Sequence, residues 1–238
     1  MKYRKPRGVT LSLVLACHPL PTLAMTIGLA AAAALTGRSA LEVGLVALTV
    51  LTGQLTVGWL NDVVDRHRDQ QVGRLDKPVA LGWIDPGTVT FAISVAVLAV
   101  VPLSIANGTY AGLAHLGAVA SAWLYNLWFK KTALSWLPYA VSFGLLPAFL
   151  SYGGLGGGMH GGPPTWAMTV LAALLGIGVH FLNTLPDLVQ DNETGVRHLP
   201  LRIALKIGAP KLLWISVTWT ALVSAGIVVA GLTVGLRQ

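Results

Sequence analysis

The chain has 238 residues, of which 54% are hydrophobic and 11% are charged, and its formal net charge is +7. A soluble domain carries about 25% charged residues, so this composition excludes an ordinary soluble enzyme, and we expect no nucleic-acid partner. The single cysteine, Cys17, excludes an internal disulfide and a cysteine zinc site.

Apolar stretches of about 20 residues, the length that crosses a bilayer core, recur along the chain. We predict an all-α, polytopic transmembrane bundle, because helices satisfy their backbone hydrogen bonds within lipid. The chain is expected to form a single domain, residues 1–238, with about seven spans. In chain order these spans cover about 9–35, 40–60, 88–106, 109–129, 133–152, 165–186 and 212–235. Pro19 and Pro21 are expected to kink the first span.

The basic residues favour one side of this bundle. With a cytoplasmic N-terminus, fourteen of the sixteen Lys and Arg residues fall on cytoplasmic segments, and only Arg38 and Arg237 fall outside. The positive-inside rule accounts for this split. We therefore predict a multi-pass protein of the inner (plasma) membrane, with the glycine-rich loop 153–164 on the outer side.

Five of the nine acidic residues lie in two short clusters, each at the end of a predicted span. Within each cluster the spacing is three or four residues, which places side chains on one face of a helix. Magnesium is usually held by a few carboxylates together with substrate phosphates. The predicted catalytic and metal-binding residues are Asp62, Asp65, Asp69, Asp187 and Asp191. The alternative for any one of these acids is a solvated helix end.

Polar and basic residues near these clusters complete the predicted site, because a leaving pyrophosphate needs cations beside the metal. The residues expected to bind the diphosphate are Asn61, Arg66, Arg74, Lys77, Lys130 and Arg197, and Arg68 and Lys131 are further candidates. Asn183 and Tyr125 are expected to line the acceptor chamber. The alternatives are that the basic residues only set topology and that Tyr125 is an interfacial anchor.

At these residues the chain resembles the UbiA superfamily of intramembrane prenyltransferases. Residues 61–69, NDVVDRHRD, match its first motif, and residues 187–191, DLVQD, match its second. The stretches 125–131 and 193–200 are also similar to the family. The chain departs from the family at 74–82, which is one residue shorter and has Lys77 in place of Arg, and in its seven predicted spans where the family usually has nine.

The resemblance implies transfer of an isoprenyl group from an allylic diphosphate donor to a lipophilic or aromatic acceptor. It also implies Mg²⁺ between the aspartates and the diphosphate. The alternatives are a UbiA-like terpene cyclase, another Mg-dependent lipid transferase, and a membrane transporter. Because both acidic clusters end their spans at the aqueous edge, we expect alanine at Asp65 or Asp191 to leave no buried partner charge.

Overall fold

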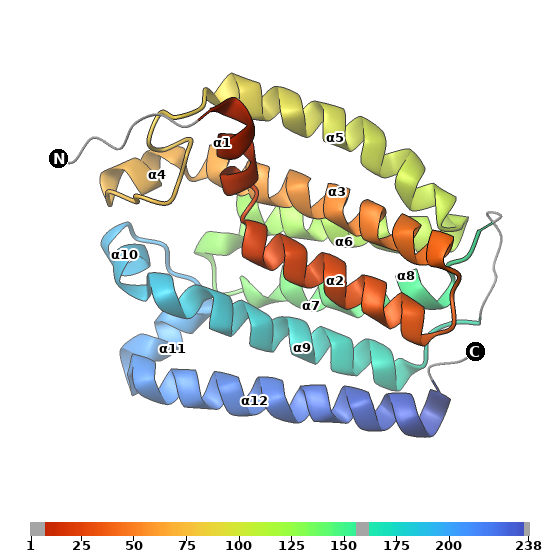
Figure 1. The fold of residues 1–238 in the computed structure, drawn as a ribbon. Helices are drawn as coiled ribbons and strands as arrows, with labels where there is room; N and C mark the ends of the chain where they lie inside the picture. The colour runs from red at the N-terminus through yellow and green to blue at the C-terminus, as the bar shows by residue number, and fades with distance from the viewer. Residues whose placement is uncertain (1–7, 156–161, 236–238) are drawn as a thin grey trace.

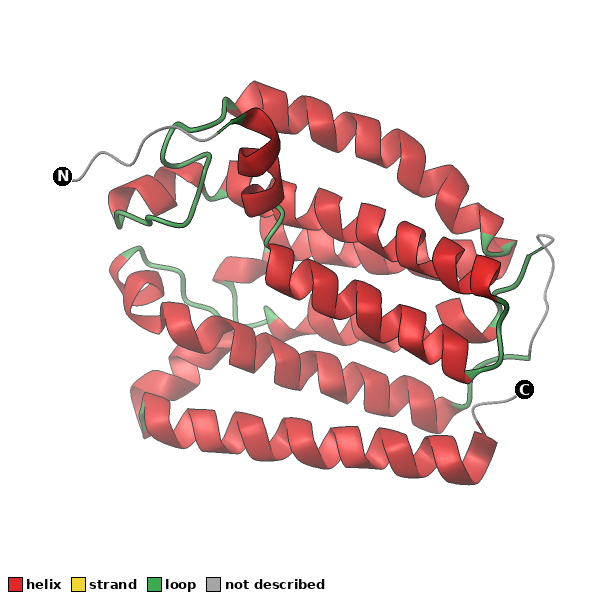
Figure 2. Ribbon diagram, in the orientation of Figure 1, coloured by secondary structure: helices red, strands yellow, loops and turns green. Residues whose placement is uncertain are grey.

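The computed structural model describes residues 8–155 and 162–235, and the regular structure within them is helical throughout (Figure 2). This confirms the predicted all-α class. Long helices lie alongside one another to form the body of the molecule (Figure 1). They are α2 (Pro19–Leu35), α3 (Ala40–Val64), α5 (Pro86–Ala106), α6 (Thr109–Leu127), α9 (Trp166–Thr184) and α12 (Ala209–Ala230).

Shorter elements connect these helices or extend their ends. They are α1 (Val9–Ala16), α4 (Arg66–Gln71), α7 (Trp136–Gly144), α8 (Leu146–Ser151), α10 (Leu188–Glu193) and α11 (Leu199–Ile207). Two 3₁₀ turns, η1 (Phe129–Lys131) and η2 (Leu185–Asp187), follow α6 and α9. The C-terminal turn of the described chain, η3 (Gly231–Gly235), is a π-helix.

Within the described residues, four helical stretches are long and apolar enough to cross a membrane: Ala40–Val64, Pro86–Ala106, Trp166–Glu193 and Ala209–Thr233. The pair α1 and α2, bent by 66°, adds a fifth if it forms one span. The other two predicted spans correspond to α6 and to the shorter apolar stretch Trp136–Ser151, which is divided into α7 and α8. The count of seven membrane spans and the cytoplasmic location of the N-terminus stay predictions. Residues 1–7 lie outside the described chain.

Local sequence sets where several helices begin. Ser39 and Glu42 form a capping box at the start of α3, in which each side chain binds the other residue's backbone N–H. The Thr165 hydroxyl accepts the N–H of Met168 at the start of α9. The Asp85 carboxylate accepts the N–H of Gly87 beside Pro86, which opens α5.

Close helix packing depends on small residues. α9 packs on both α7 and α12, while α3 packs on α2, α5 and α6. A Cβ atom at Gly176 of α9 would overlap the carbonyl of Tyr139 on α7, so only glycine permits this approach. α1, α4, α10 and α11 lie at one end of the bundle (Figure 1), and this end brings the two acidic clusters together.

Candidate active site

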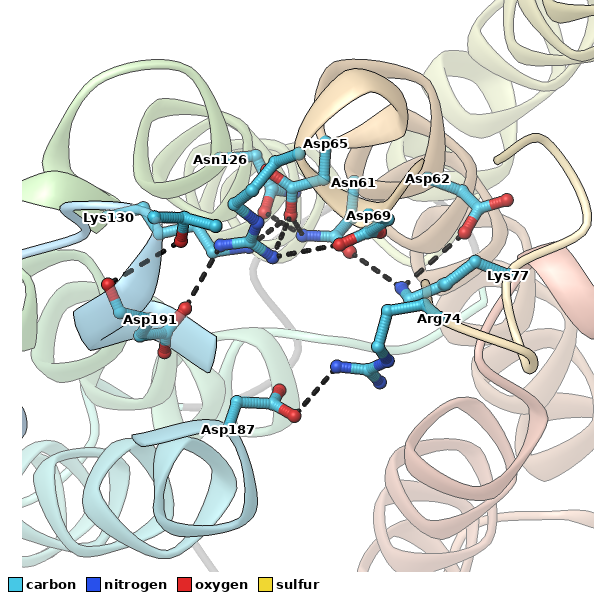
Figure 3. Close-up of polar contacts among 12 residues, drawn as sticks. Asn61, Asp62, Asp65, Asp69, Arg74, Lys77, Asn126, Lys130, Asp187 and Asp191 are labelled. Carbon is cyan, nitrogen blue, oxygen red and sulfur yellow. Dashed lines mark hydrogen bonds and ion pairs between the residues drawn. The ribbon is translucent and has the colours of Figure 1, made fainter. Parts of the chain in front are cut away.

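The first acidic cluster is divided between two helices. α3 ends at Val64, Asp65 caps it, and α4 begins at Arg66, so the prediction of one continuous helical face is wrong in detail. The backbone N–H of Asp69 still donates to the carbonyl of Asp65 at 2.9 Å, which preserves the helical spacing across the junction. Asp65 and Asp69 therefore remain on the side of the second cluster, whereas the carboxylate of Asp62 lies beside Lys77 (Figure 3).

The carboxylates of the first cluster are buried. Asp62 and Asp69 are each 1% exposed and Asp65 is 5% exposed. Oδ2 of Asp62 accepts the N–H of Val79 at 3.2 Å. Oδ1 of Asp62 and Oδ2 of Asp69 are also buried, and neither accepts a hydrogen bond from any of the residues that the structure describes. Since buried polar atoms are nearly always paired, these two oxygens suit an additional cation.

Asp65 is surrounded by positive charge. Its Oδ2 accepts from Nη2 of Arg68 at 3.1 Å, from Nδ2 of Asn61 at 3.2 Å and from the ammonium of Lys130. Burial alone would raise the pKa of Asp65, but Lys130 and Arg68 outweigh it and hold that pKa below its usual value. The carboxylate is therefore ionised at neutral pH.

The second cluster joins the first through basic side chains. Asp191 is buried, and its Oδ1 accepts from Nη1 of Arg68 at 3.1 Å. Its Oδ2 lies 2.9 Å from Nε2 of His198. Asp187 is more exposed and pairs with Nη1 of Arg74 at 2.7 Å (Figure 3).

These contacts overturn one expectation from the sequence. Asp65 and Asp191 lie at helix ends but not in water, and each has a cation as a buried or half-buried partner. Removing either carboxylate would leave the charge of Arg68 partly uncompensated. Alanine at these positions is therefore expected to destabilise the folded protein as well as to alter the site.

Most of the other predicted cations also reach the site. Lys77 is buried, with Nζ 3.4 Å from Oδ1 of Asp62. Lys130 and Arg74 make the contacts described above. Two predicted residues are not brought in: Arg66 contacts the neighbouring His67, and Arg197 is exposed without an ion pair to any described residue. Lys131 is likewise exposed.

The two residues predicted for the chamber, Tyr125 and Asn183, meet at one group of aromatic rings. Tyr125 is buried, and its ring lies perpendicular to that of Tyr139, with centroids 5.0 Å apart. The ring of His180 lies 5.6 Å from Tyr125 and 4.8 Å from Tyr139. Asn183 is exposed at this group and donates to the hydroxyl of Tyr139 at 3.1 Å.

Asn126, next to Tyr125, connects this aromatic group to the acidic clusters. Its Oδ1 accepts from Nδ2 of Asn61 at 3.0 Å. Asn61 in turn contacts both Asp65 and Lys77. The hydrogen bond between the two asparagines therefore ties α6, at the residue after Tyr125, to the charged end of the site.

The donor set can be compared with the needs of a magnesium ion. Across the described ranges, no three His, Cys, Asp or Glu side chains converge closely enough to hold one ion by themselves. Magnesium is commonly bound by one or two carboxylates plus substrate phosphates and water. The buried carboxylate oxygens that accept no hydrogen bond from the described residues therefore fit a metal that arrives with a phosphate-bearing substrate.

Sequence reasoning missed two histidines at this end of the bundle. His198 contacts Asp191, and His18 lies 2.8 Å from the ammonium of Lys77. His198 falls in the stretch that follows the second acidic cluster, and His18 directly precedes Pro19. Neither position shows a spacing that predicts its partner.

Comparison with solved structures shows that the fold is shared with known proteins. A UbiA homologue from Archaeoglobus fulgidus bound to DMAPP and Mg²⁺ has a TM-score of 0.70 and 16% identity, over 90% of this chain and 76% of that one. The same homologue bound to GPP and Mg²⁺ gives 0.69 and 16%, over 89% and 77%. Bound to Cd²⁺ it gives 0.69 and 17%, over 91% and 77%. At these identities the likeness concerns the fold.

A search of curated proteins gave no match. A sequence model of the UbiA prenyltransferase family matches residues 21–237, which include both acidic clusters and the aromatic group. This match covers most of the chain and agrees with the shared helical fold. The chain belongs to the UbiA prenyltransferase family.

Proposed function

We propose that the protein is an Mg-dependent intramembrane prenyltransferase, which moves an isoprenyl group from an allylic diphosphate to a lipophilic or aromatic acceptor. The observation that carries this proposal is the meeting of two acidic clusters, buried except for Asp187, at one end of an apolar bundle. Asp65 and Asp191 share Arg68, although Arg68 and Asp191 lie 123 positions apart. The homologue solved with DMAPP or GPP and Mg²⁺ supports this donor class.

The aspartates would hold the metal and, through it, the donor. The residues proposed for this role are Asp62, Asp65, Asp69, Asp187 and Asp191. Bound Mg²⁺ would supply positive charge to the leaving pyrophosphate, as metal ions do in phosphate chemistry. The carboxylates would exchange part of their present ion pairs for this metal.

Arg74, Lys77 and Lys130 are proposed to contact the diphosphate. Each is already held beside a carboxylate, so its charge is in place before the donor arrives. Preorganised charge of this kind stabilises a transition state more than mobile charge does. As the carbon–oxygen bond of the donor breaks, its electron pair leaves with the pyrophosphate.

The aromatic group of Tyr125, Tyr139 and His180 is proposed to line the chamber for the prenyl chain. Its packed rings would exclude water, which otherwise captures an allylic cation. Aromatic faces also attract positive charge. The acceptor would attack the cationic carbon and then lose a proton.

The proposed location is the inner (plasma) membrane, with the active site facing the cytoplasm. This rests on the distribution of Lys and Arg along the sequence. The apolar helices of the structure fit a bilayer. A terpene cyclase of the same family is the second candidate, since it would use the same charged end of the site.

Mass spectrometry of products separates these functions. The detergent-solubilised protein is incubated with DMAPP, GPP or a longer allylic diphosphate, with Mg²⁺ or EDTA, and with a panel of aromatic and lipophilic acceptors. A prenylated acceptor formed only with Mg²⁺ supports the proposal. A cyclised product without acceptor identifies a cyclase, and no consumption of any donor contradicts both.

A further inference from the structure

The first apolar segment of the described chain is broken beside the acidic clusters. α1 ends at Ala16, α2 begins at Pro19, and the two helices meet at 66°. A proline at the first position of a helix favours such a boundary. Between them, His18 has φ 55°, and it is the one non-glycine among the described residues with a positive φ. Strained backbone of this kind persists only where the surroundings hold it, and it gathers at functional sites.

α3 holds this elbow, defined here as Cys17 and His18. A Cβ atom at Gly58 would overlap the carbonyl of Cys17, so the elbow lies directly on the α3 backbone. The indole N–H of Trp59 donates to the carbonyl of Leu13 at 2.9 Å. The hydroxyl of Thr22 donates to the carbonyl of Cys17 at 2.8 Å. The elbow is therefore fixed one helical turn before Asp62.

The His18 side chain reaches the active site through Lys77. Nε2 of His18 lies 2.8 Å from Nζ of Lys77. An ammonium can only donate hydrogen bonds, so Nε2 accepts, and the imidazole is neutral with its lone pair toward Lys77. The same Nζ donates to Oδ1 of Asn61 at 3.2 Å and lies 3.4 Å from Oδ1 of Asp62.

Lys77 is thus held by two hydrogen-bond acceptors, His18 and Asn61, and by an ion pair with Asp62. It is 6% exposed, so water does not readily replace a lost partner. Two of its three N–H groups are directed to His18 and Asn61, and the charge also forms an ion pair with Asp62. Without His18, the ammonium would have an unmatched donor and would be free to move relative to the first acidic cluster.

We propose that His18 is a positioning residue, which holds the ammonium of Lys77 beside Asn61 and Asp62 and so sets its place toward the donor diphosphate. The break in the first apolar segment is then part of the active site. This inference rests on the proposed function, because the consequence it predicts is weaker binding of an allylic diphosphate. It also predicts a direct coupling between His18 and Lys77, which needs no ligand to measure.

The binding test uses the unreactive probe geranyl thiolodiphosphate with Mg²⁺ and isothermal titration of the detergent-solubilised full chain. His18→Leu removes the acceptor, whereas His18→Gln offers an amide oxygen near the position of Nε2. We expect His18→Leu to weaken binding about tenfold and His18→Gln to restore most of it. In a Lys77→Met background, His18→Leu should change binding less than twofold. An equal loss in both backgrounds, or no loss in either, would overturn the inference.

The strain at the elbow needs its own control. His18→Gly removes the side chain and suits a positive φ, so it should weaken probe binding as His18→Leu does. If His18→Gly bound the probe as tightly as wild type does, the imidazole ring would not be needed, and the inference would be overturned.

Thermal melting without ligand separates this inference from the proposed function. His18→Leu should lower Tm in the wild-type background and have little effect in the Lys77→Met background. If wild type binds no allylic diphosphate, the proposed function fails, and the melting cycle still decides whether His18 positions Lys77. Additive losses of Tm would contradict that coupling.

Discussion

Arg68 connects the two acidic clusters: its Nη1 lies 3.1 Å from Oδ1 of Asp191, across 123 positions of sequence. The other guanidinium nitrogen, Nη2, lies 3.1 Å from Asp65 and 3.3 Å from Asp69. One cation therefore lies against three carboxylates and reduces the repulsion among them. A metal bound between the clusters would have to share or replace these ion pairs.

Arg68→Gln should separate the contribution of Arg68 to stability from its competition with a bound metal. The substitution removes the positive charge that pairs with three buried carboxylates. We therefore expect the metal-free protein to lose about 3 kcal/mol of stability. Added Mg²⁺ should raise the Tm of the variant more than that of wild type, since the ion no longer competes with the guanidinium. Arg202→Gln, at an exposed arginine, is the matched control. An unchanged metal-free Tm would show that Arg68 is not needed to neutralise the clusters.

His198 has two contacts that substitutions can separate. Its Nδ1 accepts the N–H of Leu201 and caps α11, while its Nε2 contacts Asp191. His198→Asn keeps a capping oxygen but is too short to reach Asp191, and His198→Ala loses both contacts. We expect both variants to need about tenfold more Mg²⁺ for half-maximal activity. We also expect His198→Ala to be less stable than His198→Asn by about 1 kcal/mol.

The measurements for His198 are an Mg²⁺ titration of activity and a thermal melt. The Asn and Ala variants share the first defect and differ in the second. Wild-type Mg²⁺ dependence in His198→Asn would mean that His198 only caps the helix.

Part of this site could be read from the sequence. The motif residues 61–69 and 187–191 identified the aspartates, and the apolar stretches placed α3 and α9 before them. The choice between Arg66 and Arg68 could not be made, because residues two apart on a helix face different directions and the partner Asp191 is distant in sequence. The helix α11 is only nine residues long and carries Arg202 and Lys206, so it and its histidine cap do not form a long apolar run.

Burial was the other feature beyond sequence reasoning. Asp65 and Asp191 follow apolar helices, which suggests an aqueous edge, but the packing of α10 against α11 and the basic side chains cover them. Likewise, the elbow at His18 depends on the contact of Cys17 with Gly58. Such contacts arise from segments that are far apart in the chain.

The topology predicts that the two ends of the bundle face opposite sides of the membrane. Asp85, before α5, lies at the end that carries α4, and Pro163, before α9, lies at the other. Asp85→Cys and Pro163→Cys should react with a membrane-impermeant maleimide from the cytoplasmic and outer sides, respectively. The native Cys17 is buried and gives the background. Labelling of both variants from one side would contradict the proposed orientation.

Acidification should weaken the loop between α4 and α5. The hydrogen bonds of Arg74 lower the pKa of Asp76 to about 2, whereas an unfolded aspartate titrates near about 3.9. A lowered folded pKa stabilises the protein above the unfolded value, and this contribution is lost as the pH falls from about 4 through about 2. Because the Asp76 side chain is 63% exposed, solvent screens the pair, and we expect at most about 1 kcal/mol.

The check on Asp76 is the pH dependence of thermal melting between about pH 5 and about pH 2, a range that brackets the folded and unfolded pKa values. Asp76→Asn should lower Tm slightly at the upper end and show a shallower decline. A variant whose decline equals that of wild type would mean that this pair does not contribute.

The aspartates make a prediction about both rate and stability. Asp65→Asn and Asp191→Asn should each lower turnover roughly a hundred- to thousand-fold, because each removes charge that stabilises the transition state. Their effects should not add, since both act on one metal–diphosphate unit. Asp65→Ala should in addition destabilise the protein, because Lys130 and Arg68 lose a partner.

The most direct test of the account is Mg²⁺-dependent release of pyrophosphate from an allylic diphosphate by the solubilised protein. Glu193→Gln, at an exposed acid two positions after Asp191, is the matched control. We predict release by wild type and by Glu193→Gln, its loss with EDTA, and near abolition in folded Asp65→Asn and Asp191→Asn. Near wild-type release by either aspartate variant would contradict the claim that the two clusters form one catalytic site.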